Sequence, residues 1–235
     1  MKMWFDLSKD DFLRKWYEEE YTRSAYGAGP DRVQQLMHRS IEKPYTKSHH
    51  FKKVLEVGGN VGEHLKFVKH TWDEYVLTDL FDSFSIEDKH VLLSRKIRFE
   101  IADVQSLQFE TNSFDRVITT CVLHHVTDAE TSLLELRRVT KPGGTLDIFL
   151  SADPGILFRF ARWIGPYRKA KKIKLGNVKK LVDARDHINH AGGLRTLITH
   201  TFRDDDVVEL TYPIRCMTWN SSLWMIFRVR KNEDV

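Results

Sequence analysis

The sequence predicts an α/β fold whose centre is a doubly wound, mostly parallel sheet. Short apolar runs alternate with helix-length segments between residues 53 and 151, which is the pattern of strand–helix–strand units. The last two apolar runs, 207–214 and 223–231, are joined by a connection too short for a parallel crossover, so they are expected to pair antiparallel at one edge. Five strands and this pair give a seven-stranded sheet with helices ahead of it.

The first 50 residues are predicted to form an N-terminal helical cap. Ser8 is a suitable N-cap for a helix over 8–21, which carries acidic residues in its first turn. Asp31 begins a second helix over 31–41. Because these helices precede the alternating pattern, we expect them to cover a site on the main domain, residues 51–235.

The alternating pattern assigns the elements of the main domain in chain order. Connecting helices are expected over 63–72 and from Asp128 to a stop at Pro142–Gly144. Strands are expected over 53–58, 74–80, 97–104, 113–126 (where the strand runs into a loop) and 145–151.

Composition restricts the class of protein. The 235 residues are 41% apolar and 30% charged, which suits one sizeable core. No apolar run approaches the roughly 18 residues of a membrane span, and the N-terminus turns acidic before a signal-like run develops. Cys121 and Cys216 fit neither a metal spacing nor a disulfide framework. We therefore expect a cytoplasmic protein.

The turn after the first strand, LEVGGNVGEHL (residues 55–65), is a candidate ligand site. Ligands of parallel sheets bind at the carboxyl ends of the strands, where strand order reverses. Gly58, Gly59 and Gly62 permit positive φ, and Asn60 tolerates that region better than most residues. The spacing fits neither a dinucleotide fingerprint nor a P-loop, so NAD and ATP are not favoured. Taken alone, the segment also fits an ordinary strand-to-helix turn.

Two acidic residues strengthen the ligand interpretation. Asp79 ends the second strand, where a carboxylate can accept hydrogen bonds from both hydroxyls of a ribose. Asp103 ends the third predicted strand and can accept from an adenine amino group. Each acid alone could instead cap the helix that follows. Together with the glycine loop they favour a nucleoside-containing cofactor.

The ordered segments VLEVGGNVGEHL, VLTDL, IADV, SFDRVITTCVLHHV and LLELRRVTKPGGTLDIFL resemble the class I S-adenosylmethionine-dependent methyltransferases, whose fold is Rossmann-like. The resemblance covers roughly residues 53–151, and it departs from the family's E-x-G-x-G-x-G loop at Asn60, the middle glycine position. It implies S-adenosylmethionine as cofactor. It further implies that Glu56 and the Gly58–Gly62 backbone meet the amino-acid end, Asp79 with Leu80 the ribose, Asp103 and Val104 the adenine, and Thr120 and Cys121 the region near the sulfonium.

Methyl transfer requires a base only when the acceptor atom carries a proton. His187 and His190, between the fifth strand and the antiparallel pair, are the predicted bases. The alternative is a hydrogen-bonded pair that organises the loop. A third ligand of convincing spacing is missing, so no metal is predicted. Tyr26, in the helical cap, is expected either to contact the cofactor and close the site or to pack the cap on the core.

The acceptor is less constrained by the sequence. The acceptor-region insertion at about 154–202 contains a run from Arg159 to Lys180 that has nine basic residues and no acid, and aromatic residues are interleaved at its start. Residues 156–180 are therefore a candidate peripheral membrane contact, or else a substrate-covering helix with solvated lysines. No nucleic-acid-reading module accompanies them, so nucleic acid is not an expected partner.

Three functions stay open at this point. The favoured one is methylation of a small-molecule hydroxyl on a sugar, glycolipid or secondary metabolite, which includes lipid-linked acceptors. The second is N-methylation of a phospholipid head group or a macromolecule. The third is a non-catalytic cofactor-binding protein of the same fold.

Overall fold

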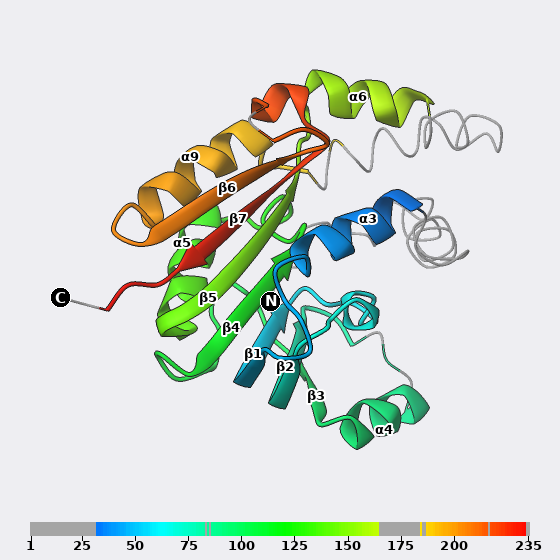
Figure 1. Ribbon diagram of the computed structural model, residues 1–235, viewed down its shortest axis with the longest axis vertical. Coiled ribbons are helices and arrows are strands. Elements are labelled where there is room, and N and C mark those ends of the chain that lie inside the picture. Colours follow the sequence, from blue (N-terminus) through cyan, green and yellow to red (C-terminus); the bar gives the residue numbers. More distant parts are fainter. Residues whose placement is uncertain are drawn as a thin grey trace, which may run out of the picture.

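A computed structural model describes residues 32–82, 84, 86–164, 184, 187–215 and 217–233 (Figure 1). Seven strands form one sheet in the order β3-β2-β1-β4-β5-β7-β6. Their bounds are β1 His50–Val57, β2 Thr71–Asp79, β3 Ile97–Ile101, β4 Phe114–Thr120, β5 Thr140–Ser151, β6 Asp206–Tyr212 and β7 Trp224–Arg230. Neighbours among β1 to β5 pair in parallel, whereas β7 is antiparallel to both β5 and β6. The predicted fold class is confirmed.

Helices cover both faces of this sheet. Those described are α3 Arg32–Ile41, α4 Ile86–Ser94, α5 Ala129–Val139, α6 Ile156–Arg162 and α9 Ala191–Thr201, with short 3-10 turns η3 His64–Lys66 and η5 Trp219–Ser221. One buried apolar cluster joins α5 and α9 to alternate residues of the strands, and a second joins α3 and α4 to the opposite face. Figure 1 shows α3 on the side of the sheet away from α5 and α9.

Helix α3 is the part of the predicted N-terminal cap that lies within the described residues. Its Ile41 and Met37 pack with Val54 and Leu77 of the central strands. This contact brings the end of the cap against the middle of the sheet. The helix predicted over 8–21 lies outside the described residues.

Two predicted elements differ in the structure. The helix predicted over 63–72 is limited to η3, because Thr71 and Trp72 pair with His50 and Phe51 in the β1–β2 ladder. The stop predicted at Pro142–Gly144 lies within β5, in an irregular stretch where Gly143 has φ +72°. Thr140 already pairs with Phe114, so helix α5 ends at Val139 and the bulge follows it.

Two further boundaries bear on the site. β3 ends at Ile101, so Asp103 lies beyond the strand, in an isolated bridge with Ser106.

Helix α9 was not predicted from the sequence, because Gly192 and Gly193 in its first turn lower helix propensity. The Asp128 cap of α5 is confirmed, since its Oδ1 accepts from the Thr131 amide at 2.9 Å.

Candidate active site

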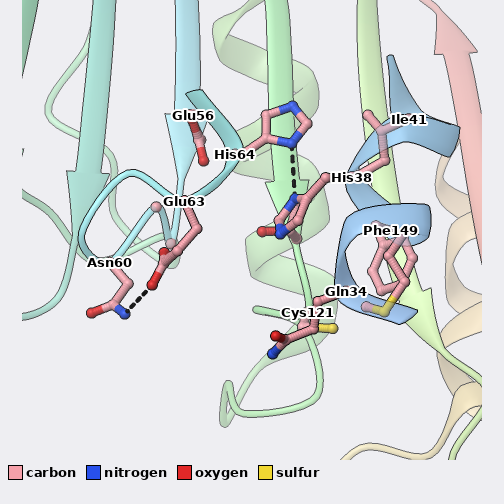
Figure 2. A pocket seen from close by; sticks show the side chains of 13 residues that line it. Gln34, His38, Ile41, Glu56, Asn60, Glu63, His64, Cys121 and Phe149 are labelled. Atoms are coloured by element: carbon pink, nitrogen blue, oxygen red, sulfur yellow. Dashed lines mark hydrogen bonds between the residues drawn. The ribbon is translucent and has the colours of Figure 1, made fainter. Parts of the chain in front are cut away.

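A cavity of about 140 Å³ lies at the carboxyl ends of β1 and β4, the point where strand order reverses (Figure 2). Three parts of the chain line it: the loop after β1, the end of β4 and helix α3. The lining residues are Gln34, Met37, His38, Ile41, Glu56, Gly58, Gly59, Asn60, Glu63, His64, Thr120, Cys121 and Phe149.

The loop after β1 is held in a conformation that requires its residue types. Gly58 and Gly62 have φ of +74° and +75°, and Asn60 has φ +45°, so the asparagine occupies the left-handed region as its residue type permits. The Gly58 and Gly59 amides both donate to the Thr78 carbonyl, at 2.8 and 3.0 Å. A Cβ on Gly58 would lie 2.0 Å from a methyl carbon of Val122, so the loop leaves no space for a side chain there.

Glu56 supplies a buried acceptor beside this loop. The Tyr75 hydroxyl donates to its Oε2 at 2.5 Å, whereas Oε1 has no hydrogen-bond partner among the described residues. That free oxygen lies 3.3 Å from where a Cβ on Gly59 would stand, so it borders the cavity. Burial raises the pKa of Glu56 above its ordinary value. A cationic donor in the cavity would satisfy the unpaired oxygen and favour the ionised form.

The other predicted cofactor residues fall into two groups. Thr120 and Cys121 line the cavity with Glu56, Gly58, Gly59 and Asn60. Cys121 has φ +60°, and burial raises the pKa of its thiol to about 12, so the thiol stays protonated. The second group, Gly62, Asp79, Leu80, Asp103 and Val104, lies outside the lining of this cavity. Tyr26 is outside the described residues.

The two acids of that second group organise backbone in this structure. Asp79 Oδ2 accepts from the Asn60 amide at 2.9 Å, which ties the glycine loop to the end of β2. Asp103 Oδ1 accepts from the Gln105 amide at 2.9 Å and so stabilises the turn after β3. Both side chains are partly exposed. The carboxylates therefore retain acceptor capacity for a ligand.

Sequence reasoning expected the N-terminal helices to cover a site, but it named none of the α3 residues that line this cavity. Gln34, His38 and Ile41 recur at helical spacing on one face of α3, and that spacing was the available signal. His38 Nδ1 lies 3.0 Å from His64 Nδ1, and the His38 ring stacks on Phe67 with centroids 5.1 Å apart. Figure 2 shows the two imidazoles joined across the cavity wall. Burial and the neighbouring His64 lower the pKa of His38 to about 4.

Behind these histidines lies a buried ionic network. His64 Nε2 is 3.0 Å from Glu42 Oε1, which also accepts from Arg116 Nη2 at 2.7 Å. Arg116 is fully buried on β4 and donates from Nη2 to Asp147 Oδ2 at 2.9 Å. Burial opposes ionisation of Glu42, but the His64 hydrogen bond and the Arg116 charge lower its pKa to about 2. The carboxylate is therefore ionised at neutral pH.

Tyr45 and Arg228 complete the network. The Tyr45 hydroxyl donates to Asp147 Oδ2 at 2.8 Å, and the Arg116 guanidinium lies 3.7 Å from the centroid of the Tyr45 ring. Arg228 of β7 donates to Asp147 Oδ1 at 2.7 Å and to the Ile41 carbonyl at 3.0 Å. The network fastens the end of α3 to β4, β5 and β7, so this wall of the cavity is fixed.

A second histidine cluster lies where β4 and β5 end. His187 stacks on His124 with centroids 5.0 Å apart, and its Nδ1 is 2.8 Å from Asp153 Oδ2. The buried His124 bonds the Asn189 carbonyl at 2.8 Å and Ser151 Oγ at 3.1 Å. Although burial opposes it, His187 helps lower the pKa of Asp153. The cluster thus holds a paired His187 at the same edge of the sheet as the cavity.

His190, the other predicted base, occupies a different position. It is the N-cap residue of α9, its side chain is exposed, and it makes no side-chain capping bond. The structure therefore does not bring His187 and His190 into one pair. Among the residues described, no group of three or more His, Cys, Asp or Glu side chains is placed to hold a metal ion. No helix in the described ranges is long and apolar enough to cross a membrane.

Known proteins that are similar in sequence or structure point to the same class of cofactor. Residues 55–148 match the family described as Methyltransferase domain. The hybrid PKS-NRPS synthetase poxE of Penicillium oxalicum is 28% identical over 154 residues, which are 59% of this chain and 3% of that protein. The ubiquinone/menaquinone biosynthesis C-methyltransferase UbiE of Teredinibacter turnerae is 32% identical over 109 residues, 43% of this chain and 44% of that one. The chain thus spans less than half the length of these curated relatives.

A solved structure extends the likeness over nearly the whole chain. The N-methyltransferase NodS from Bradyrhizobium japonicum WM9, in complex with S-adenosyl-L-homocysteine, has a TM-score of 0.61 at 17% identity and covers 95% of this chain and 100% of that one. A sheet of this strand order with a glycine loop at its switch point defines a Rossmann-like nucleoside-cofactor domain. Residues 55–148 are similar to the methyltransferase domain family, and the fold around them is that of the class I S-adenosylmethionine-dependent methyltransferases, whose cofactor is S-adenosylmethionine.

The residues at the cavity fit this cofactor. The unpaired Glu56 Oε1 is a buried acceptor suited to an ammonium group, and the loop presents backbone rather than side chains at Gly58 and Gly59. A cavity of about 140 Å³ suits the amino-acid end of the cofactor, and the nucleoside end would then extend toward Asp79 and Asp103.

Proposed function

We propose that the protein transfers a methyl group from S-adenosylmethionine to a small molecule, and that the acceptor atom is a hydroxyl on a sugar, glycolipid or secondary metabolite. One observation carries the choice of a proton-bearing acceptor. His187 and Asp153 stand as an imidazole–carboxylate pair at the carboxyl end of β5, with Nδ1 and Oδ2 2.8 Å apart. Such a pair is useful where a proton must be removed.

The pair sets the direction of proton transfer. An ionised Asp153 can only accept, so a hydrogen on His187 Nδ1 would serve this contact and would leave the lone pair of Nε2 for the acceptor. The Nε2 atom then takes the hydroxyl proton as the oxygen gains the methyl group. Bound S-adenosylmethionine supplies that methyl group on a sulfonium sulfur. The protein's part is to align the acceptor and exclude water, which lowers the barrier by roughly 7–11 kcal/mol in well-oriented systems.

The cofactor would be held by the residues that the family resemblance assigns. Glu56 and the backbone from Gly58 to Gly62 would hold the amino-acid end, Asp79 and Leu80 the ribose, and Asp103 and Val104 the adenine. Thr120 and Cys121 would border the sulfonium. Because Asp79 also binds the Asn60 amide, an Asp79→Asn variant is the fitting comparison for Asp79→Ala. Asp79→Asn keeps an oxygen that can accept from the Asn60 amide. A loss of affinity in this variant would therefore report on ribose binding and not on the order of the loop.

A carbon acceptor is the second candidate. The similar protein from Teredinibacter turnerae is named a C-methyltransferase, and a carbon acceptor also loses a proton. The third candidate is nitrogen in a phospholipid head group, supported by exposed apolar residues on and after α6: Ile156, Phe160, Trp163 and Ile164. Residues 165–180 of that candidate membrane contact lie outside the described residues. A non-catalytic cofactor-binding role is the remaining alternative.

The test is a product assay with S-adenosylmethionine labelled in its methyl group. The purified chain is incubated with phenolic and sugar alcohols, β-dicarbonyl compounds and phosphatidylethanolamine vesicles. Label in an O–CH₃ group, identified by NMR, supports the proposal. Label on carbon or nitrogen selects one of the other acceptors. Cofactor binding without label transfer to any class would contradict enzymatic function.

A further inference from the structure

The cavity carries two opposite kinds of polar group. The carboxyl groups of Glu56 and Glu63 belong to β1 and the glycine loop, whereas the imidazoles of His38 and His64 belong to α3 and η3. Figure 2 shows the two carboxyl groups to the left of the two rings. An amino acid has one cationic and one anionic end, so a zwitterion is the ligand that matches both groups.

The network behind the cavity favours one placement of the hydrogens on the two rings. The ionised Glu42 accepts only, so His64 Nε2, 3.0 Å away, must carry a hydrogen. When the other nitrogen of His64, Nδ1, is the acceptor of the 3.0 Å contact, the hydrogen of that contact lies on His38 Nδ1. The second nitrogen of a neutral His38, Nε2, consequently has a lone pair and no hydrogen. In this state His38 cannot donate to an anion.

We propose that His38 binds the carboxylate at the amino-acid end of S-adenosylmethionine, and that it takes up a proton at Nε2 when the cofactor binds. The inference rests on the proposed use of this cofactor and adds a residue outside the glycine loop. The ammonium group would go to the unpaired Glu56 Oε1, and the carboxylate to the imidazolium of His38, with Gln34 beside it on α3. Stacking on Phe67 holds the His38 ring in place for this contact.

The surrounding charges make proton uptake dependent on the ligand. His38 faces His64 of η3 and Glu42, the residue after its own helix, while Glu56 and Glu63 line the same cavity. Burial and His64 hold the pKa of His38 near 4 in the absence of ligand, so the ring is neutral at pH 7. A carboxylate in contact favours the charged ring and raises that pKa. The contribution of His38 to the affinity should therefore increase as the pH falls.

The experiment is calorimetric titration with S-adenosylhomocysteine, which keeps the amino-acid end and is not consumed. Titrations at one pH in buffers of different ionisation enthalpy give the number of protons taken up. Because Glu56 also titrates in this cavity, the wild type is compared with His38→Gln, and the difference isolates His38. We expect the variant to take up fewer protons and to bind roughly tenfold to hundredfold more weakly. Between pH 8 and 5 the wild type should gain up to about tenfold in affinity per pH unit relative to the variant.

A second ligand removes the group that His38 is proposed to bind. Methylthioadenosine lacks the amino-acid end, so wild type and His38→Gln should bind it equally, within roughly twofold. His200→Gln, an exposed histidine on α9, is the matched control and should behave as wild type with both ligands. If His38→Gln fails to fold, His38→Asn takes its place in the same comparison with the wild type.

The outcomes separate this inference from the proposed function. Equal proton uptake by wild type and His38→Gln with S-adenosylhomocysteine overturns the role of His38 while cofactor binding stands. A neutral His38 that accepts from the ammonium group would give that result. Failure of the wild type to bind S-adenosylhomocysteine at all would instead count against the proposed function.

Discussion

The two histidine clusters at the carboxyl edge of the sheet differ in what stands behind them. His38 and His64 are backed by the buried charges of Glu42, Arg116 and Asp147, which also fasten α3 to the sheet. His187 is backed by Asp153, which is paired with Arg162 of α6 at 3.4 Å and is closer to solvent. A rigid, buried support suits recognition of an unchanging cofactor. The more exposed support of His187 by Asp153 suits the acceptor side of the site, where ligands vary.

Breaking the buried support should have the largest effect. Arg116→Met leaves Glu42 and Asp147 buried without their cation, and removal of one partner of such a group costs about 3–5 kcal/mol. We expect that loss in the free energy of unfolding, measured with urea. The control is Arg98→Met, an exposed residue paired with Glu74, which should change stability by less than about 1 kcal/mol. A loss that small for Arg116 would contradict the role assigned to the network.

Removing the base should affect turnover without affecting cofactor affinity. His187→Gln is expected to lower kcat by about 10²–10⁴-fold, the usual contribution of general base catalysis. Its affinity for S-adenosylhomocysteine should stay at the wild-type value, since His187 does not line the cofactor cavity. His190→Gln separates the two predicted bases, because His190 is exposed at the start of α9. A larger loss of kcat in His190→Gln than in His187→Gln would make His190 the base instead.

The pH dependence of stability compares the clusters in one measurement. Burial lowers the pKa of both His38 and His124 to about 4 from an ordinary 6.5. The unfolded chain therefore binds more protons between these values, and stability falls as the pH drops from 6.5 to 4. Urea midpoints should decline across this window in the wild type and less steeply in His38→Gln or His124→Gln. A flat wild-type profile would contradict the neutral, buried state of these rings.

The smallest effect concerns α6, on the acceptor side. The side chains of Ile156, Phe160 and Trp163 are 70%, 55% and 61% exposed, close to Arg159 and Arg162. If this surface contacts membranes, Trp163→Ala should weaken binding to anionic vesicles by roughly fivefold in a sedimentation assay. Leu134→Ala, an exposed apolar residue on α5, should leave binding unchanged. If the wild type does not bind vesicles, the membrane contact is contradicted and a small soluble acceptor is favoured.

The sequence predicted what depends on local pattern. Alternating apolar runs located the strands, and the glycine loop with Asn60 identified the end of the sheet that carries the cavity. The buried network that holds α3 at the site was missed. Glu42, Arg116 and Asp147 are successively 74 and 31 residues apart along the chain, and nothing local links their charges. The helix over 63–72 was wrong because strand pairing of Thr71 and Trp72 prevailed over helical spacing.

The position of β7 has a consequence for biosynthesis. This strand lies between β5 and β6, although β6 precedes it in the chain, so β6 has no partner in the sheet until residues 224–230 have been made. Buried Lys231, just after β7, then donates to Asn112 Oδ1 at 2.7 Å and to the Thr140 carbonyl at 3.1 Å. On the ribosome, β1 to β5 can assemble early. The acceptor side is completed only after the chain has been translated through Lys231.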